Sequence, residues 1–149
     1  MHRSWRNAGG HSRDDSPPQT AGQKTSQGQA MMPEADPRFK QAIELFNIQE
    51  WYAAHDVIEE LWHETVDPER RSLQGILQVA VAQLHLQRGN RRGATILFGE
   101  ALGRLQRSGT PDLGLDLDSL CRCVRSRLTA LQQDLDPEDC TVPVLHLRG

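Results

Sequence analysis

The chain has 149 residues, 37% of them hydrophobic, and a formal net charge of −3. Its mean hydropathy is −0.60. This length suits one domain with a buried core. The net negative charge argues against general electrostatic binding of nucleic acid. No stretch of the sequence approaches the ~18 consecutive apolar residues of a membrane-spanning helix.

The first 30 residues differ in composition from the rest of the chain. They contain no Val, Ile, Leu or Phe and are rich in Gly, Ser, Gln and Pro. Such a segment cannot bury enough apolar surface to offset its ordering entropy, so we expect a disordered arm over residues 1–35. Its Arg and Ser residues would suit a transit peptide, but Asp14 and Asp15 argue against one. We favour a start-site artefact, because Met31 or Met32 precedes the folded part.

Three cysteines indicate a reducing, cytoplasmic compartment, because an odd number without a secretion signal is not a disulfide framework. Cys121 and Cys123 are separated by one residue. On a helix their side chains diverge by about 200°, so we expect structural thiols and no shared metal ion.

The first two predicted helices form a hairpin. Asp36 as cap and Pro37 in the first turn predict a helix that reaches about Asn47. A second helix is expected over roughly residues 50–65, where apolar side chains such as Ile58 recur at helical spacing.

The third predicted helix, about residues 68–88, is the central one. Asp67 is its expected cap and Pro68 its first helical residue. Between Arg71 and Arg88 there is no Lys, Arg, Asp or Glu, and apolar groups lie nearly all round. Such a helix is buried by neighbours on several sides, and we expect a close approach on the side of Gly75.

Two further helices and a tail complete the fold. Gly89-Asn90 predicts a helix end followed by the cap of a helix over about residues 91–107. Asp116 or Asp118 caps a last helix that extends to Leu135, with residues 136–149 as an extended tail that docks on the bundle. We therefore predict an all-α fold: a five-helix bundle of two antiparallel helical hairpins plus a closing helix over residues 36–135.

Two apolar helices carry polar stripes. His55 and Glu59 lie one turn apart on the second helix, and Gln74, Gln78 and His85 align on the third. Buried polar groups need partners. The stripes therefore form a closed packing network, line a pocket for a small molecule or a partner's peptide, or make a metal-assisted or acid–base hydrolytic site from His55, Glu59 and His85. The missing Glu-x-x-His repeats weigh against a metal.

Arginines crowd two further places. Arg91 and Arg92 follow the helix turn, while Arg122, Arg125 and Arg127 lie on the last predicted helix. A charged helix face is usually a solvated one. The alternative is contact with nucleic acid, which would weaken steeply with salt.

The order of these motifs resembles the family named domain of unknown function 309, small helical bacterial and plastid-lineage proteins. The likeness covers roughly residues 38–107. The matching positions are His55, Glu59, Trp62, Gln74, Gly75, Gln78, His85, Gly89, Asn90, Gly93 and Ala94. The chain departs from the family at Ile48-Gln49, where such proteins often carry a glycine, which leaves the shape of that turn open.

The resemblance implies an all-helical fold and brings no established activity, substrate or cofactor. We therefore expect an uncharacterised accessory or interaction module, with a protein partner and without a cofactor, rather than an enzyme. The binding cluster would be His55, Glu59, Trp62, Gln74, Gln78 and His85, and the helix turn would be Gly89, Asn90, Gly93 and Ala94.

Overall fold

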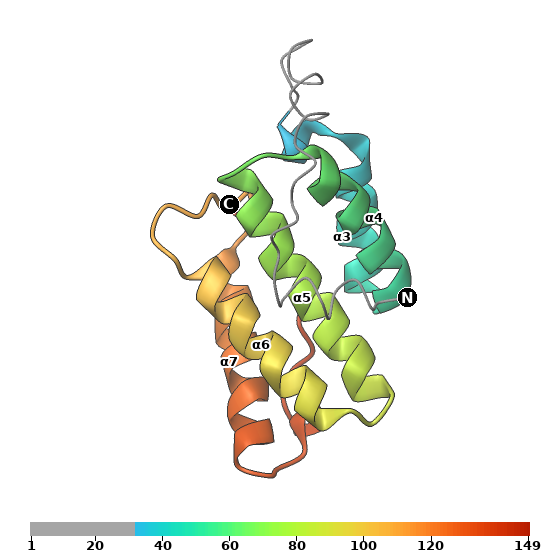
Figure 1. Ribbon diagram of the computed structural model, residues 1–149, viewed down its shortest axis with the longest axis vertical. Coiled ribbons are helices and arrows are strands. Elements are labelled where there is room, and N and C mark those ends of the chain that lie inside the picture. The colour runs from blue at the N-terminus through green and yellow to red at the C-terminus, as the bar shows by residue number, and fades with distance from the viewer. Residues whose placement is uncertain (1–31) are drawn as a thin grey trace. The chain divides into compact units, whose positions relative to one another are not determined.

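The computed structural model describes residues 32–149. Of the predicted disordered arm over residues 1–35, residues 1–31 lie outside the described part, whereas Pro33–Ala35 form a short 3-10 helix with Pro33 buried, which corrects the prediction there. The described chain is all-helical, as predicted, and its β-pairing is limited to an isolated bridge (Figure 1). Its elements are η2 (Pro33–Ala35), α3 (Pro37–Asn47), α4 (Trp51–Glu64), α5 (Glu69–Gln87), α6 (Arg91–Leu105), α7 (Leu117–Gln132) and η3 (Pro137–Asp139). Within residues 32–149, none of the helices combines the length and apolar character needed to cross a membrane.

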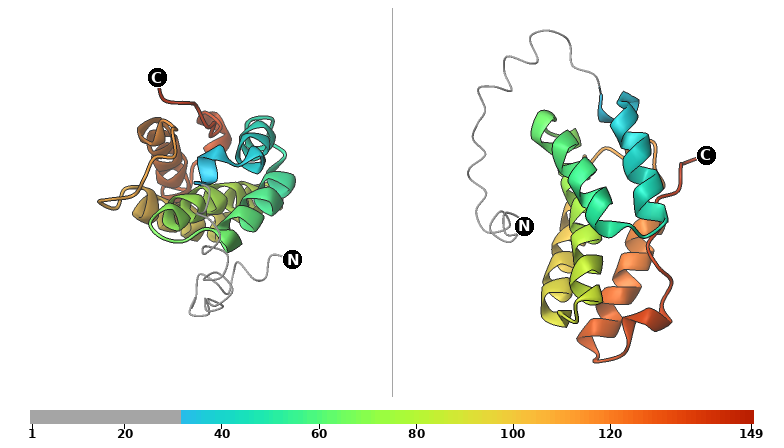
Figure 2. Two further views of the ribbon diagram at one scale, coloured as in Figure 1. Left: turned by 90° about the horizontal axis from the view of Figure 1, so that it is seen from above. Right: turned by 90° about the vertical axis from the view of Figure 1, so that its right-hand side faces the viewer.

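The helices form two hairpins and a closing helix, which confirms the predicted arrangement. Helix α3 packs against α4, α5 against both α4 and α6, and α7 against α6. The views from two further sides show α5 and α6 running side by side along their length (Figure 2). Twelve of the 19 residues of α5 are buried, so α5 is the central helix that its all-round apolar surface predicted.

Gly75 brings α5 and α6 close together. A Cβ atom at this position would fall 2.6 Å from the side chain of Leu105 on α6. Real Cβ atoms do not come this near, so only glycine allows the present packing. The close approach predicted on this side of α5 is therefore confirmed.

Asp36 caps α3 and also holds an arginine. Its carboxylate accepts from the backbone N–H of Arg38 at 2.9 Å and pairs with the Arg38 guanidinium at 2.9 Å. The same guanidinium reaches Glu64 at the end of α4, 2.7 Å away. The side-chain hydrogen bond from Arg38 lowers the pKa of Asp36 below its ordinary value. Asp36 thus starts α3, and the Arg38 that it holds joins α3 to α4.

The turn between α3 and α4 lacks the glycine common in the resembling family. Gln49 takes the left-handed conformation instead, with φ of +67°. This backbone region favours glycine, so the turn at Ile48-Gln49 is made with a strained residue in the left-handed conformation.

Two predicted boundaries were wrong. Helix α5 begins at Glu69, Pro68 precedes it, and no side-chain hydrogen bond caps it, so Asp67 is not the predicted cap. Helix α7 ends at Gln132 rather than at Leu135. Asp134 has a φ of +65°, which turns the chain out of the helix as a left-handed residue does at many helix ends, and Leu135 is 56% exposed.

The C-terminal tail docks along the bundle. The side-chain amide of Asn47 donates to the carbonyl of Leu145 at 2.9 Å and accepts from its N–H at 2.8 Å. The Leu145 side chain is buried. The backbone N–H of Asp116 donates to the carbonyl of His146 at 2.8 Å. The tail thereby ties the end of α3 to the loop before α7.

Arg127 corrects the sequence-based expectation of a solvated arginine face, because its side chain is fully buried. All its N–H groups point at acceptors. Nε donates to the carbonyl of Thr141 (2.8 Å), Nη1 to Gln83 Oε1 (3.2 Å) and Glu138 Oε2 (3.5 Å), and Nη2 to Glu138 Oε1 (3.3 Å) and the carbonyl of Cys140 (3.1 Å). Arg127 therefore fastens the start of the tail to α5 and α7.

Candidate functional site

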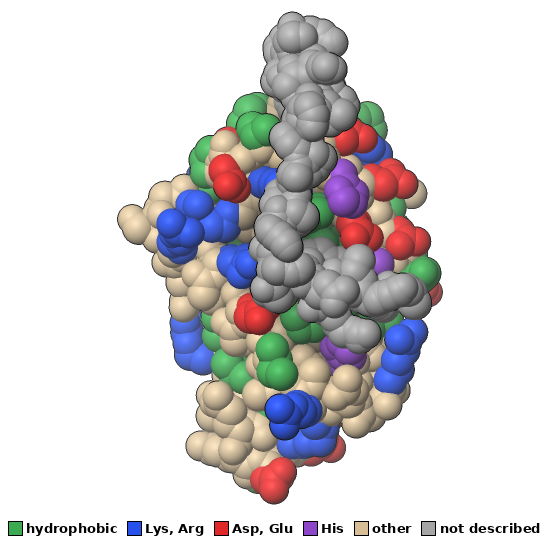
Figure 3. Space-filling view, in the orientation of Figure 1, with side chains coloured by type: hydrophobic (Ala, Val, Ile, Leu, Met, Phe, Trp, Pro, Cys, Tyr) green, Lys and Arg blue, Asp and Glu red, His purple; other side chains and the backbone are tan. Residues whose placement is uncertain are grey.

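His55 lies on α4 between two carboxylates of its own helix. The side chain is 5% exposed, with Nδ1 at 3.3 Å from Asp56 Oδ1 and Nε2 at 3.4 Å from Glu59 Oε1. One ligand atom from each of these three residues lies within 4.8 Å of the others. We call His55, Asp56 and Glu59 the histidine group. Acidic and histidine side chains gather on this side of the molecule, over α4 (Figure 3).

The histidine group allows two kinds of chemistry. A carboxylate oxygen lies within 3.4 Å of each ring nitrogen, so an imidazole and two carboxylates, the groups of acid–base chemistry, lie together. Alternatively, one ring nitrogen and two carboxylate oxygens form the kind of N/O ligand set that zinc or manganese accepts. The sequence indicated His55 and Glu59 as site residues but not Asp56, whose side chain is 56% exposed. Its position directly after His55 is what brings it to Nδ1.

Trp62 stacks with a cation from the neighbouring helix. The guanidinium carbon of Arg70, on α5, lies 3.8 Å from the centre of the Trp62 ring. Such a cation–π contact contributes roughly 0.5–2 kcal/mol. This predicted site residue therefore helps to join α4 to α5 across their connecting turn.

His85 lies in the last turn of α5, next to the turn that leads to α6. Gly89 has a φ of +75°, and the side chain of Asn90 caps α6 by accepting from the N–H of Gly93 at 2.8 Å. Asn90 Nδ2 lies 3.1 Å from His85 Nδ1. A Cβ atom on Gly93 would fall 2.6 Å from the Asn90 amide, which explains the glycine. The next residue, Ala94, is fully buried.

The glutamines of α5 face α6. Gln78 is fully buried, and its Nε2 donates to Glu100 Oε1 at 2.8 Å. Its Oε1 has no hydrogen-bond partner among the described residues. Gln74 and Glu100 both line a pocket between α5 and α6. Of the residues in the predicted polar stripes, Gln74 therefore lies at this pocket.

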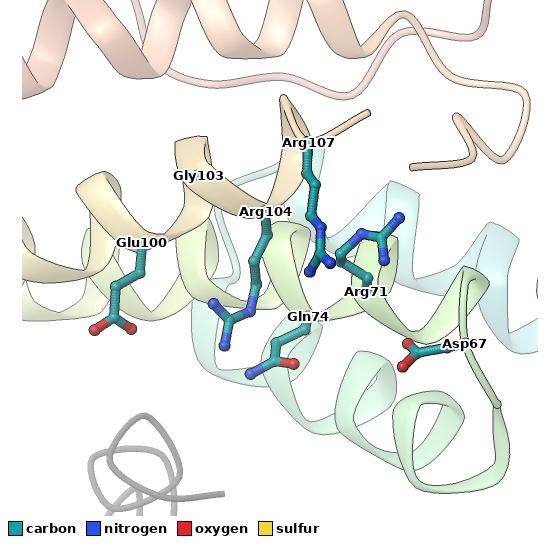
Figure 4. A pocket seen from close by; sticks show the side chains of 7 residues that line it. All are labelled: Asp67, Arg71, Gln74, Glu100, Gly103, Arg104 and Arg107. Carbon is teal, nitrogen blue, oxygen red and sulfur yellow. The ribbon is translucent and has the colours of Figure 1, made fainter. Parts of the chain in front are cut away.

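The pocket has a volume of about 440 Å³, within the usual range for small-molecule sites. Figure 4 shows guanidinium groups from both helices at its centre. We call it the α5–α6 pocket, and its lining residues are Asp67, Arg71, Gln74, Glu100, Gly103, Arg104 and Arg107. Sequence reasoning missed its three arginines. A signal existed, because the start of α5 must meet the end of α6 in an antiparallel hairpin.

The arginines that the sequence analysis singled out lie elsewhere. Arg91 donates to the carbonyl of Leu135 at 3.0 Å and so joins the start of α6 to the end of α7. Arg92, Arg122 and Arg125 are exposed. Contact of these arginines with nucleic acid stays the less favoured alternative, and convergence of His55, Glu59 and His85 on one ligand stays untested.

Two comparisons with known proteins bear on this site. Residues 39–97 match the family model described as Domain of unknown function (DUF309). The uncharacterized protein YpuF of Bacillus subtilis (strain 168) is 32% identical over 87 residues, which cover 56% of this chain and 50% of the relative. The chain thus matches about half the length of that curated relative.

The family match contains the histidine group, Trp62, Gln74 and the turn around Asn90, while Glu100 and Arg104 lie beyond it. Neither the family description nor the relative's name states an activity. The resemblance that the order of the sequence motifs indicated is confirmed: from α3 to the middle of α6, this chain matches the family named domain of unknown function 309.

Proposed function

We propose that this chain is a cytoplasmic helical accessory module without catalysis, which binds a polar group of a small molecule or protein partner in the α5–α6 pocket. The observation that carries the proposal is that Gln74, from the polar stripe of α5, lines the pocket together with Glu100, which Gln78 holds. The polar stripe of α5 thus reaches the protein surface at this pocket.

The chemistry of the lining favours binding over catalysis. The seven lining residues are arginines, carboxylates, one amide and one glycine. Arginine is always charged and does not serve as a general base. The set contains no histidine, cysteine or serine, and its two carboxylates do not form a pair, since Asp67 and Glu100 lie at opposite ends of the pocket (Figure 4) and Glu100 already accepts from Gln78. These groups suit recognition of a polar ligand.

The histidine group has a structural role in this proposal. Its contacts, from His55 to Asp56 and to Glu59, join residues of the same helix. They offset the cost of burying the imidazole next to the apolar core of α4. The group therefore fixes the packing of α4 and leaves the binding to the pocket.

NMR titration of the ¹⁵N-labelled protein tests the proposal with glucose, spermidine and citrate as neutral, cationic and anionic probes. We expect at least one probe to give saturable shifts confined to the pocket-lining turns of α5 and α6. Gly103→Leu should abolish them by filling the pocket, since a Cβ there meets nothing within 4 Å. Gly99→Leu, equally unhindered but outside the pocket, should not. Absence of binding by all three probes would refute the proposal.

A second candidate function rests on the histidine group, whose ligand atoms lie within 4.8 Å of one another. It would be a metal-assisted or acid–base hydrolase. Calorimetric titration with zinc and with manganese tests it, using Glu59→Gln, which should abolish binding, and the exposed Glu44→Gln, which should not. If the parent protein takes up neither metal with a defined stoichiometry, the metal-assisted version of this candidate is excluded.

A further inference from the structure

We propose that the α5–α6 pocket recognises its ligand through a phosphate or carboxylate group held by Arg71, Arg104 and Arg107. This inference rests on the proposed function and names the chemical class of the ligand. The three guanidinium groups come from the start of α5, the last turn of α6 and the residues just after it, and they point into one pocket (Figure 4).

Several arginines of the described chain pair with a carboxylate, but the three arginines that line this pocket do not. Arg38, Arg127 and Arg148 each lie within 3.3 Å of a carboxylate oxygen. Among residues 32–149, no carboxylate pairs with a guanidinium of the pocket. Like charges gathered without a counter-charge repel one another. An anion in the pocket would turn that repulsion into attraction.

Arg71 is already held in place for such a ligand. Its Nε donates to Thr110 Oγ1 at 2.8 Å, and the same hydroxyl donates to the carbonyl of Arg104 at 2.9 Å. This relay fixes the guanidinium at the end of α6 and leaves its two terminal nitrogens for other acceptors. Preorganised donors lower the entropy cost of binding, and a guanidinium binds carboxylate or phosphate through two parallel hydrogen bonds.

Two features that could satisfy the arginines without a ligand are too weak. The C-terminal end of a helix carries about half a negative charge, which balances at most part of one guanidinium. Asp67 and Glu100 lie at opposite ends of the pocket (Figure 4), and Glu100 already accepts from Gln78. Three positive groups and two carboxylates leave the lining with a formal charge of +1, and a phosphate monoester carries about −2.

The volume of about 440 Å³ favours an organic anion over a lone phosphate ion, since sites of 300–1,000 Å³ bury molecules of drug size. The ligand would therefore be a phosphomonoester or a compact polycarboxylate. Glu100 and Gln74 can then accept from and donate to hydroxyl groups on the remainder of the molecule.

Titrations with glucose 6-phosphate, citrate, glucose and spermidine at low ionic strength separate these possibilities. The readout is the Nε–Hε signals of the arginines in ¹⁵N-labelled protein. We expect saturable shifts with glucose 6-phosphate, citrate or both, and none with glucose or spermidine. Arg104→Gln and Arg107→Gln should each weaken binding about tenfold or more. The matched control is Arg92→Gln, an exposed arginine of the same helix, which should change it less than about twofold.

The outcomes distinguish this inference from the proposed function. Glucose or spermidine binding in the pocket without the anions would overturn the anion assignment and leave the pocket as a binding site. Equal weakening by Arg92→Gln would also overturn it, because diffuse surface charge would then explain the effect. If none of the probes binds, both proposals fail. Since Arg104 and Arg107 are not buried, thermal unfolding should show that both variants fold.

Discussion

Replacing Arg127 by methionine should lower the free energy of unfolding by about 3 kcal/mol. The arginine is fully buried and donates five hydrogen bonds. Methionine fills similar space with no donor, so the carbonyl of Cys140 and the amide oxygen of Gln83 lose this donor, whereas the carbonyl of the exposed Thr141 keeps the thiol of Cys123 as a donor. Each unsatisfied buried acceptor costs about 1–3 kcal/mol. Glu138, whose side chain is 60% exposed, returns to water at little cost, which keeps the total near the low end.

Arg127→Met could also be expected to leave the free energy of unfolding unchanged. Replacing a whole buried ion pair by apolar residues of similar size is often neutral or stabilising. This does not apply to Arg127, because two of its acceptors are backbone carbonyls and no side-chain change removes them. The variant removes one side of the network and leaves the other.

Urea unfolding followed by circular dichroism measures the difference. A loss of ~3 kcal/mol corresponds to a fall in melting temperature on the order of 10 °C for a chain of this size. Glu138→Gln, which keeps the acceptors of the tail paired, should cost less than about 1 kcal/mol. The exposed Arg125→Met should be nearly silent. An Arg127→Met protein within about 1 kcal/mol of the parent would show that the network is not what fastens the tail.

Three smaller effects follow from single positions. Since Arg38 lowers the pKa of Asp36, the ion pair stabilises above the unfolded-state pKa of about 4 and is lost as pH falls through the lower folded value. Asp36→Asn should therefore cost roughly 0.5–1 kcal/mol at pH 7 in urea unfolding, and progressively less as the pH is lowered below about 4. Gly75→Ala should destabilise by about 1–3 kcal/mol through overpacking, whereas Gly99→Ala, unhindered, should stabilise by about 0.5–1 kcal/mol in the same assay. Burial raises the pKa of Cys121, so mass spectrometry of iodoacetamide-treated native protein should show this thiol alkylated last.

The helices could be predicted because their signals are local. Asp36, Asn90 and Asp116 each accept a backbone N–H as the caps that the sequence indicated. Apolar residues at helical spacing then define the buried faces. The end of α7 was predicted too late, at Leu135, because the left-handed residue that ends the helix is Asp134. Glycine usually indicates such a helix end, whereas an aspartate in a polar segment does not.

The burial of Arg127 could have been predicted from its position on α7, but the arginines near it in the sequence obscured this. It lies between Val124 and Leu131 at spacings of three and four residues, the spacing of the buried face of α7. Arg122 and Arg125, close to it in the sequence, are exposed, and the three arginines were therefore interpreted together as one solvated face of the helix. Position on the helix, and not residue type, separates the buried arginine from the other two.

The polar stripes mark the limit of what one helix can reveal. Helical spacing tells which face a side chain occupies, but a helix packed on several sides has more than one neighbour for each face. The stripe of α5 was expected to meet α4. Gln78 instead reaches Glu100 on α6, while His55 has Asp56 and Glu59 of its own helix as partners. The choice between neighbours depends on residues distant in sequence, so the α5–α6 pocket emerges only once the hairpin has formed.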